Sequence, residues 1–210
     1  MHGPLQFLSE MTPPRGYRDD NLRFDLRPDS SAIDSVNAWI NGHNLSERRL
    51  VVMAPGSIQP HKRWPEASFA TLIGSIPSKY DDVSLVIVGT PADQEVGERL
   101  RLLAPDKVFN LAGKSDIAQS AALMARSALV VGNDGGAMHL ADAMGAKVIS
   151  LIPGIEYPDS IEPWHNKDLA IRWPVECAPC YSFTSCPQGH HKCMNSIPAS
   201  LVFDKCASVL

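Results

Sequence analysis

Short apolar runs alternate along the chain with longer stretches in which apolar residues recur at helical spacing. The apolar runs predict strands at 50–54, 84–88, 108–111, 129–132 and 147–151, with a weaker sixth at 169–172. Between the strands, apolar residues recur at helical spacing, which predicts helices at 66–76, 93–103, 117–125 and 137–144. Strands that are apolar throughout are typical of a parallel sheet covered on both faces. The alternation therefore predicts an α/β fold with a doubly wound, Rossmann-like parallel sheet.

The two ends of the chain have a different pattern. Residues 1–48 are expected to form a lead-in that is irregular at first and contains a short amphipathic helix at 31–43, with Asp29, Ser30 or Ser31 as its cap. Residues 49–210 are expected to form one domain. Proline and cysteine are concentrated at 174–197, which predicts a long structured loop, and a last helix at 198–208 closes the domain.

Composition narrows the function classes. The net charge is −4 and no basic stripe occurs, which argues against nucleic acid as a partner. The longest apolar runs are much shorter than the roughly 20 residues that a membrane-spanning helix needs. The first residues lack a cationic region followed by an apolar core, so we expect no secretory signal and a cytoplasmic location.

Three predicted strands are followed by residues that suit a nucleotide, because ligands of open parallel sheets bind beyond the carboxyl ends of the strands. After the first strand, Gly56 permits a tight turn, Ser57 offers a hydroxyl, and Lys62 and Arg63 bring positive charge to the start of the next helix. This loop predicts a phosphate or pyrophosphate site. The alternative is a loop with a solvated basic pair.

The other two loops add acidic and glycine residues. Asp93 or Glu95, after the second strand, is suited to accept hydrogen bonds from ribose hydroxyls, or simply favours a helix N-terminus by its charge. After the fourth strand come Asp134, Gly135, Gly136 and, three residues later, His139. Two glycines before a helix let an anion approach its free N–H groups, with the imidazole beside them. An ordinary helix cap with a half-buried histidine is the alternative.

Several familiar motifs are absent. The segment Gly113-Lys114-Ser115 resembles the end of a phosphate-binding P-loop, but Val108 stands where its first glycine is required. No G-x-G-x-x-G follows the first strand, and no D-x-D pair lies at a strand end. A diphosphate held by Lys62 and helix N-termini is therefore favoured over one held through a metal ion.

Four cysteines, Cys177, Cys180, Cys186 and Cys193, crowd into one loop with His190 and His191. Such a set could hold zinc or iron. The second cysteine pair, however, is separated by six residues, which is loose for a metal site. We therefore interpret these side chains as reduced structural thiols and expect no metal and no cofactor.

Taken together, the segments 55–57, 62–65, 110–115, 131–141 and 177–194 resemble glycosyltransferase family 9, the ADP-heptose:lipopolysaccharide heptosyltransferases. The resemblance runs from about residue 50 to the C-terminus. It implies the GT-B architecture, in which two Rossmann-like domains face each other. The C-terminal half binds the ADP-sugar, and the N-terminal half binds the lipid-linked saccharide acceptor and supplies the general base. This chain resembles only the C-terminal half, so no catalytic base is carried over, and a fragment or a separate N-terminal acceptor domain is implied.

The resemblance also implies roles for individual residues. Ser57 corresponds to a hydroxyl near the diphosphate, Lys62 to a phosphate-binding lysine, and Asp93 or Glu95 to a carboxylate near the ribose. Ser115 corresponds to a residue on the adenosine side. The remaining residues match the turn that binds the donor phosphate and sugar; they are Asp134, Gly135, Gly136 and His139. The family usually has serine or threonine at the position of Gly135, so one hydroxyl donor is missing.

The implied reaction is an inverting transfer of a sugar, heptose by resemblance, from an ADP-sugar to a lipopolysaccharide core acceptor. Such an acceptor would place the enzyme peripherally at the inner membrane. Two alternatives remain open. One is another GT-B enzyme that uses a UDP or GDP donor, and the other is a non-catalytic module whose loop at 177–193 binds metal or a partner chain.

Overall fold

A computed structural model describes residues 26–210, so the first 25 residues of the predicted lead-in lie outside the described part of the chain. Its centre is a six-stranded sheet in the order β3-β2-β1-β4-β5-β6, in which every neighbouring pair is parallel. The strands are β1 (Arg49–Ala54), β2 (Val83–Ile87), β3 (Val108–Asn110), β4 (Leu129–Asn133), β5 (Val148–Ile152) and β6 (Ile171–Arg172). The predicted doubly wound parallel sheet is confirmed.

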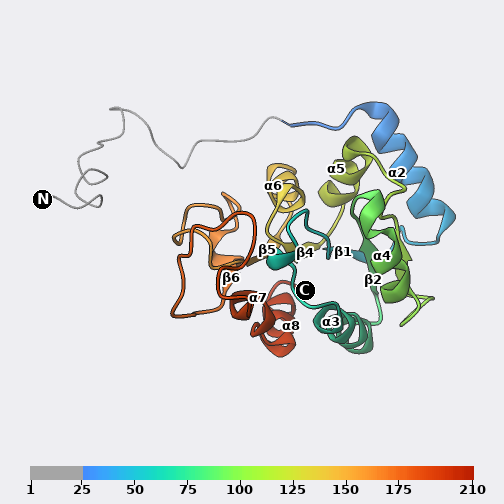
Figure 1. Cartoon of the computed structure of the whole chain (residues 1–210). Helices are drawn as coiled ribbons and strands as arrows, with labels where there is room; N and C mark the ends of the chain where they lie inside the picture. The colour runs from blue at the N-terminus through green and yellow to red at the C-terminus, as the bar shows by residue number, and fades with distance from the viewer. Residues whose placement is uncertain (1–25) are drawn as a thin grey trace, which may run out of the picture.

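Helices cover both faces of the sheet (Figure 1). One face carries α3 (Glu66–Lys79), α4 (Gln94–Arg101) and α8 (Ala199–Ala207), and the other carries α2 (Ser30–Gly42), α5 (Ile117–Ala125) and α6 (Gly136–Ala143). Alternate side chains of each strand enter opposite cores. On β1, Val51 and Met53 pack toward the first set of helices, whereas Leu50, Val52 and Ala54 pack toward the second.

Helix α2 lies in the predicted lead-in but packs as part of the sheet's core. Its Val36 and Ile40 are buried in the same cluster as Val52 and Val130. Asp29 is the cap among the three candidates, because its Oδ1 accepts a hydrogen bond from the N–H of Ala32 at 2.8 Å. The boundary between residues 48 and 49 stays a prediction.

Most predicted elements are observed with ends shifted by one to three residues. Helix α3 continues beyond Ile76 through Pro77, whose ring is buried in the core. The helix predicted at 93–103 begins instead as a 3-10 turn, η3 (Pro91–Asp93), and ends at Arg101. A short helix inside the cysteine-rich loop, α7 (Lys192–Asn195), was not anticipated.

The strand order reverses between β1 and β4, the two central strands that run side by side. This pair packs closely, since a Cβ added at Gly132 would lie 2.5 Å from the carbonyl oxygen of Ala54. The loops that leave β1 and β4 therefore begin next to each other at the carboxyl edge of the sheet. Ligands of doubly wound folds bind at such a switch point.

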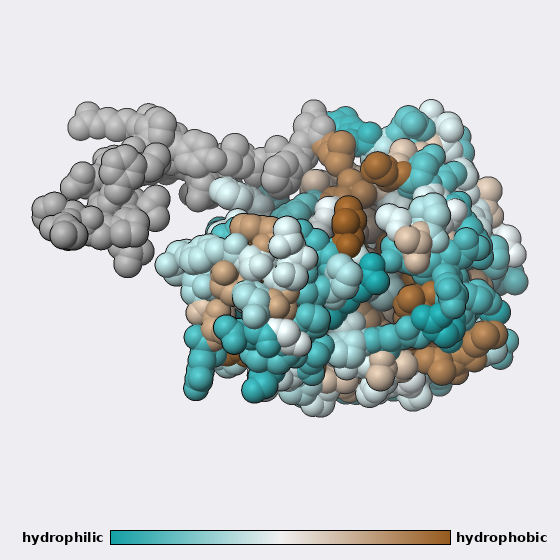
Figure 2. Space-filling view, in the orientation of Figure 1, coloured by the Kyte–Doolittle hydropathy of each residue, from teal (hydrophilic) through white to brown (hydrophobic). Residues whose placement is uncertain are grey.

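The outer surface is mostly hydrophilic on the face seen in Figure 2, with apolar residues in separate patches. Among residues 26–210, the large apolar side chains that are most exposed are Ile58 and Ile117. Within the same range, no helix combines the length and the apolar character needed to cross a lipid bilayer.

Candidate functional site

Lys62 and Asp134 meet at the switch point. Lys62 ends a 3-10 turn, η2 (Pro60–Lys62), in the loop that follows β1, and Asp134 is the first residue after β4. The Lys62 Nζ donates a hydrogen bond to Asp134 Oδ2 at 3.0 Å, and the two side chains are 17% and 5% exposed. A largely buried ammonium is thus held in place by a carboxylate.

The N-terminus of α6 lies directly beyond this pair. Gly135 is extended and caps the helix, and its carbonyl accepts the N–H of Met138 at 3.0 Å. A Cβ added at Gly135 or Gly136 would meet nothing within 4 Å, so the backbone there is open to a ligand. The first N–H groups of a helix lack intrahelical partners and carry partial positive charge. The geometry therefore suits an anion.

Ser57 lies in the loop between β1 and Lys62, where Arg63 folds back onto it. The Nε and Nη2 atoms of Arg63 donate to the carbonyl oxygen of Ser57 at 2.8 and 2.6 Å. The Ser57 hydroxyl accepts the N–H of Gln59 at 3.3 Å. Arg63 thus braces the loop, while Lys62 alone of the basic pair turns toward Asp134.

The structure separates the two carboxylates after β2. Asp93 is buried, and its Oδ2 accepts hydrogen bonds from the N–H and hydroxyl of Thr90 at 2.9 and 2.7 Å. Its carboxylate also abuts Gly56, where an added Cβ would lie 2.4 Å from Asp93 Cγ. Glu95 is exposed and pairs with Arg99 at 2.8 Å. Only Asp93 is brought against the loop that carries Ser57 and Lys62.

Ser115 lies at another part of the edge, beyond β3. Its hydroxyl is 3.0 Å from the hydroxyl of Ser120 and donates to the carbonyl oxygen of Leu111 at 3.4 Å. It lines a small cavity of about 80 Å³ next to Trp39 of α2 and Lys114. Ser115 is therefore two strands away from β1, on the side of the sheet covered by α2 and α5.

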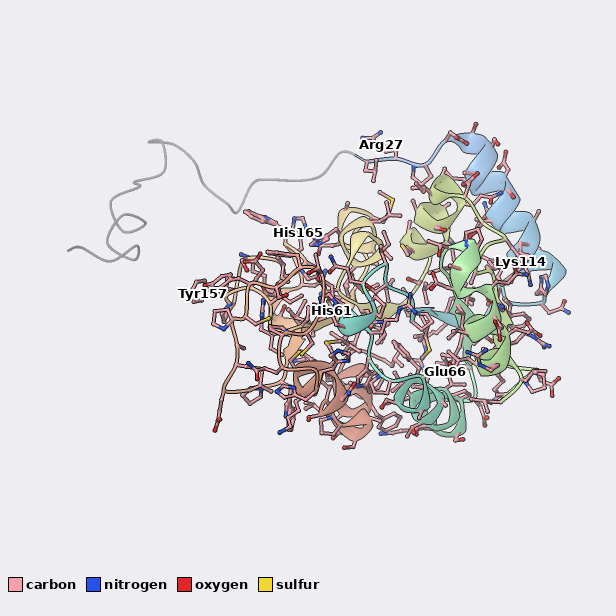
Figure 3. The ribbon with its side chains drawn as sticks, in the orientation of Figure 1. Arg27, His61, Glu66, Lys114, Tyr157 and His165 are labelled. Atoms are coloured by element: carbon pink, nitrogen blue, oxygen red, sulfur yellow. The ribbon has the colours of Figure 1, made fainter. Side chains whose placement is uncertain are left out.

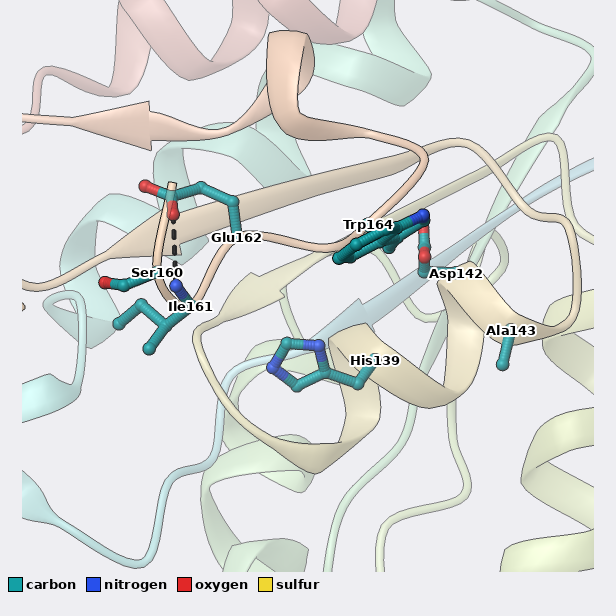
Figure 4. A pocket seen from close by; sticks show the side chains of 7 residues that line it. All are labelled: His139, Asp142, Ala143, Ser160, Ile161, Glu162 and Trp164. Atoms are coloured by element: carbon teal, nitrogen blue, oxygen red, sulfur yellow. Dashed lines mark hydrogen bonds between the residues drawn. The ribbon is translucent and has the colours of Figure 1, made fainter. Parts of the chain in front are cut away.

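His139 is exposed on α6 and borders a hollow of about 270 Å³ with Trp164 and Ser160 (Figure 4). Two carboxylates also line this hollow. Asp142 is buried and accepts hydrogen bonds from the backbone N–H of His165 at 3.0 Å and from the side chain of Asn166 at 2.6 Å. Glu162 pairs with Arg172. Both carboxylates are therefore engaged within the protein, and the Ser160 hydroxyl donates to the carbonyl oxygen of Tyr157, whereas His139 is exposed.

The cysteine-rich loop packs near η2. Burial lowers the pKa of His61, and the positive charges of His191 and Lys62 lower it further, so the loop lies close to this imidazole. His61 is 7% exposed, and its Nε2 has no hydrogen-bond partner among the described residues. Figure 3 shows His61 on the turn of η2, of which it is the middle residue.

The four thiols of this loop remain free cysteines. Burial alone raises the pKa of Cys186, but hydrogen bonds from backbone N–H groups of residues 188–191 bring that pKa below its usual value. Burial raises the pKa of Cys193. Within residues 26–210, no three side chains of the histidine, cysteine, aspartate and glutamate types are grouped to hold a metal ion.

Sequence reasoning overlooked Asn133, the last residue of β4. Its side chain is buried and forms hydrogen bonds to the backbone at both ends of the loop that contains Lys62. An asparagine that ends a buried strand, directly before Asp134, was the available signal.

The sequence is similar to those of known proteins. The profile of glycosyltransferase family 9 (heptosyltransferase) matches residues 16–191, beginning well before the expected start near residue 50. Lipopolysaccharide heptosyltransferase 2 of Escherichia coli is 33% identical over 132 residues, which are 60% of this chain and 37% of that protein. Lipooligosaccharide heptosyltransferase 2 of Campylobacter jejuni is 26% identical over 168 residues, which are 78% of this chain and 51% of that protein.

Solved structures share the fold. The ADP-heptose lipopolysaccharide heptosyltransferase II of E. coli superimposes with a TM-score of 0.67 at 24% identity, covering 88% of this chain and 52% of that one. A family 9 glycosyltransferase of Veillonella parvula gives 0.73 at 22% identity, with the same coverage of 88% and 52%. The chain thus spans between about a third and a half of the length of these relatives. The matched profile, which extends over most of the sequence, shows that the chain belongs to glycosyltransferase family 9.

Proposed function

We propose that this chain is the donor-binding half of a heptosyltransferase that transfers heptose from an ADP-sugar to a lipopolysaccharide core acceptor. The observation that carries the proposal is the meeting of Lys62, Asp134 and the start of α6 at the switch point between β1 and β4. A cation and a helix N-terminus that converge on one accessible place form a site for a diphosphate.

The same groups suit the departure of ADP. In an inverting transfer, an acceptor hydroxyl attacks the anomeric carbon from the face opposite the diphosphate, and the bond to the diphosphate oxygen breaks. Negative charge then grows on the leaving group. Lys62 and the N–H groups at Gly136 would stabilise that charge, each by about 2–4 kcal/mol. The proton of the acceptor hydroxyl would pass to a base on the acceptor half.

Other predicted residues are assigned around this centre. Asp93 is the better candidate for the ribose, because it lies against the loop of Ser57 whereas Glu95 pairs with Arg99. Ser115, beside the cavity next to α2, would lie on the adenosine side. His139 would contact the donor phosphate or sugar at the first turn of α6.

The acceptor side would be supplied by a second domain, either on a longer form of this chain or on a separate polypeptide. The lengths of the relatives support this part of the proposal, since the chain spans about half or less of each. A lipid-linked acceptor would bring the complete enzyme to the cytoplasmic surface of the inner membrane. We propose no metal or cofactor for the transfer itself.

Calorimetric titration of the chain with ADP, UDP and GDP tests the proposal. Selective binding of ADP, weakened in Lys62→Ala, is the expected result. Tighter binding of UDP or GDP would indicate that the donor is a UDP-sugar or a GDP-sugar instead of an ADP-sugar. Absence of binding to all three nucleotides, both alone and with an added family 9 N-terminal domain, would overturn the proposed function.

A further inference from the structure

The side chain of Asn133 bridges two points of the loop that leaves β1. Its Oδ1 accepts a hydrogen bond from the backbone N–H of Trp64 at 2.8 Å. Its Nδ2 donates to the carbonyl oxygen of Pro55 at 2.7 Å and lies 3.4 Å from that of Gly56. The residue is 3% exposed, so these bonds are shielded from water.

The two bridged points are the ends of the loop that contains Lys62. Pro55 is the first residue after β1, and Trp64 is the second residue after Lys62. Asn133 is itself the last residue of β4 and directly precedes Asp134 and the start of α6. One amide therefore joins the backbone that carries the ammonium to the strand end that carries the helix N-terminus.

We infer that Asn133 is a positioning residue for phosphate recognition, which sets the loop of Lys62 against the start of α6 so that both meet the same anion. The inference rests on the proposed function. Asn133 acts through Lys62 and contacts no ligand, because its amide atoms are turned to the protein backbone. A bidentate amide suits this task, since it pairs with one backbone donor and one backbone acceptor at once.

A separate anchor keeps the region folded when Asn133 is removed. The indole Nε1 of Trp64 donates to the carbonyl oxygen of Ile197 at 3.0 Å. The Trp64 ring also packs edge-on against Phe69, with centroids 4.8 Å apart. Loss of the Asn133 amide should therefore loosen the segment between Pro55 and Trp64 without unfolding the domain.

The chain offers a matched control in Asn166, at the opposite edge of the sheet. Asn166 is 4% exposed, and its Oδ1 accepts the N–H of Val148 at 3.1 Å. Its Nδ2 donates to Asp142 Oδ1 at 2.6 Å and to the carbonyl oxygen of Ala146 at 3.1 Å. Asn133→Ala and Asn166→Ala thus each remove a buried side-chain amide with several hydrogen bonds, but only Asn133 bonds to the loop of Lys62.

The first measurement is ADP affinity by calorimetry, at a temperature where circular dichroism shows both variants folded. Asn133→Ala is expected to weaken ADP binding at least about tenfold, and Asn166→Ala by less than about twofold. In the Lys62→Ala background, Asn133→Ala should weaken ADP binding much less, because the effects of two residues that act as a unit are not additive. Equal losses in the two asparagine variants, or full additivity with Lys62→Ala, would overturn the inference.

A second measurement needs no ligand. Hydrogen–deuterium exchange of residues 55–64 should become faster in Asn133→Ala and stay unchanged in Asn166→Ala. If the unaltered chain binds no nucleotide, either alone or with an added family 9 N-terminal domain, the proposed function fails, and the exchange experiment still decides whether Asn133 fixes this loop. Unchanged protection of the loop in Asn133→Ala would refute the positioning role by itself.

Discussion

Lys62 and Asp134 are 72 positions apart in sequence, yet Lys62 Nζ lies 3.0 Å from Asp134 Oδ2 across the switch point of the sheet. The pair neutralises a cation that would otherwise be left largely buried without a partner. A phosphate that binds here must compete with Asp134 for the ammonium or share it. Asp134 therefore already fixes the position of the lysine that would meet the proposed anion.

Replacing Lys62 by alanine should weaken ADP binding by about tenfold or more, because a charge-assisted hydrogen bond to phosphate is lost. It should also lower the free energy of unfolding by about 1–3 kcal/mol, since the buried Asp134 carboxylate loses its partner. Calorimetry and urea unfolding measure the two effects.

The control for this variant is Lys107→Ala. Lys107 pairs with Asp81 at the same distance of 3.0 Å, but Asp81 is fully exposed, and the pair precedes β3 at the opposite edge of the sheet. Lys107 Nζ also donates to the carbonyl oxygen of Pro77 at 3.0 Å, so its loss should lower stability slightly, but ADP affinity should stay nearly unchanged. A comparable loss of affinity in Lys107→Ala would show that overall positive charge, rather than the Lys62 site, determines binding.

The fold could be predicted because most residues of the strands are apolar, and because apolar residues in the helices recur at helical spacing. Asp116 caps helix α5 and precedes its first residue, and its side chain accepts the N–H of Gln119 at 2.7 Å. Helix α7 was missed because four residues are too few to show a period. The end of α3 was predicted too early, because proline normally marks a helix boundary. Pro77 instead lies inside the helix and contributes buried surface to the core.

The candidate site could be predicted only as separate loops. Sequence spacing gives no information on which loops meet, so the choice between Asp93 and Glu95 required the contact of Asp93 with Gly56. The bracing of the loop by Arg63 and by Asn133 depends on backbone carbonyls that no side-chain pattern reveals. The strand order observed in the structure shows which loops meet, because it places β1 next to β4.

Gly56→Ala should destabilise the chain by about 1–3 kcal/mol, because a Cβ there has no space. The added carbon would lie 2.4 Å from the Asp93 carboxylate, which is itself held by Thr90. Urea unfolding measures the loss. Gly74→Ala in α3 is the control, since its Cβ would meet nothing within 4 Å, and this variant should not be destabilised. Equal stability of Gly56→Ala and the unaltered chain would contradict the contact.

Cysteine reactivity should follow the surroundings of each thiol. Backbone N–H groups lower the pKa of Cys186, whereas burial raises the pKa of Cys206 to about 12. Since the thiolate is the reactive form, iodoacetamide at neutral pH should modify Cys186 well before Cys206. Peptide mass spectrometry over a time course measures the order, and unfolded protein, in which the two should react alike, is the control. Early labelling of Cys206 in the folded chain would contradict its burial.

Stability should fall as the pH drops below the ordinary histidine pKa of about 6.5. Burial, together with His191 and Lys62, lowers the pKa of His61 in the folded chain. The unfolded chain therefore binds a proton on His61 before the folded chain does, and stability present above that pH is lost as the pH falls. His61→Gln should flatten this part of the profile in urea unfolding between pH 7 and pH 5. An unchanged slope in His61→Gln would contradict this role of the imidazole.

Restoring a hydroxyl at position 135 should strengthen phosphate binding. Gly135 has an extended backbone with φ of 162°, and a Cβ there would meet nothing within 4 Å, so serine fits without strain. Serine is also a good helix cap, and the loss of glycine restricts the unfolded chain. The melting temperature of Gly135→Ser should therefore stay the same or rise.

The hydroxyl introduced by Gly135→Ser would stand beside the first N–H groups of α6, where the resemblance to family 9 implies serine or threonine. One hydrogen bond from it to an ionised phosphate should tighten ADP binding by up to about tenfold. Gly135→Ala separates this effect from backbone rigidity, because it adds the Cβ without the hydroxyl and should leave the affinity near that of the unaltered chain. A gain in Gly135→Ala equal to that in Gly135→Ser would assign the effect to rigidity. No gain in either variant would mean that the bound phosphate lies out of reach of residue 135, and would place the anion nearer Lys62 than the start of α6.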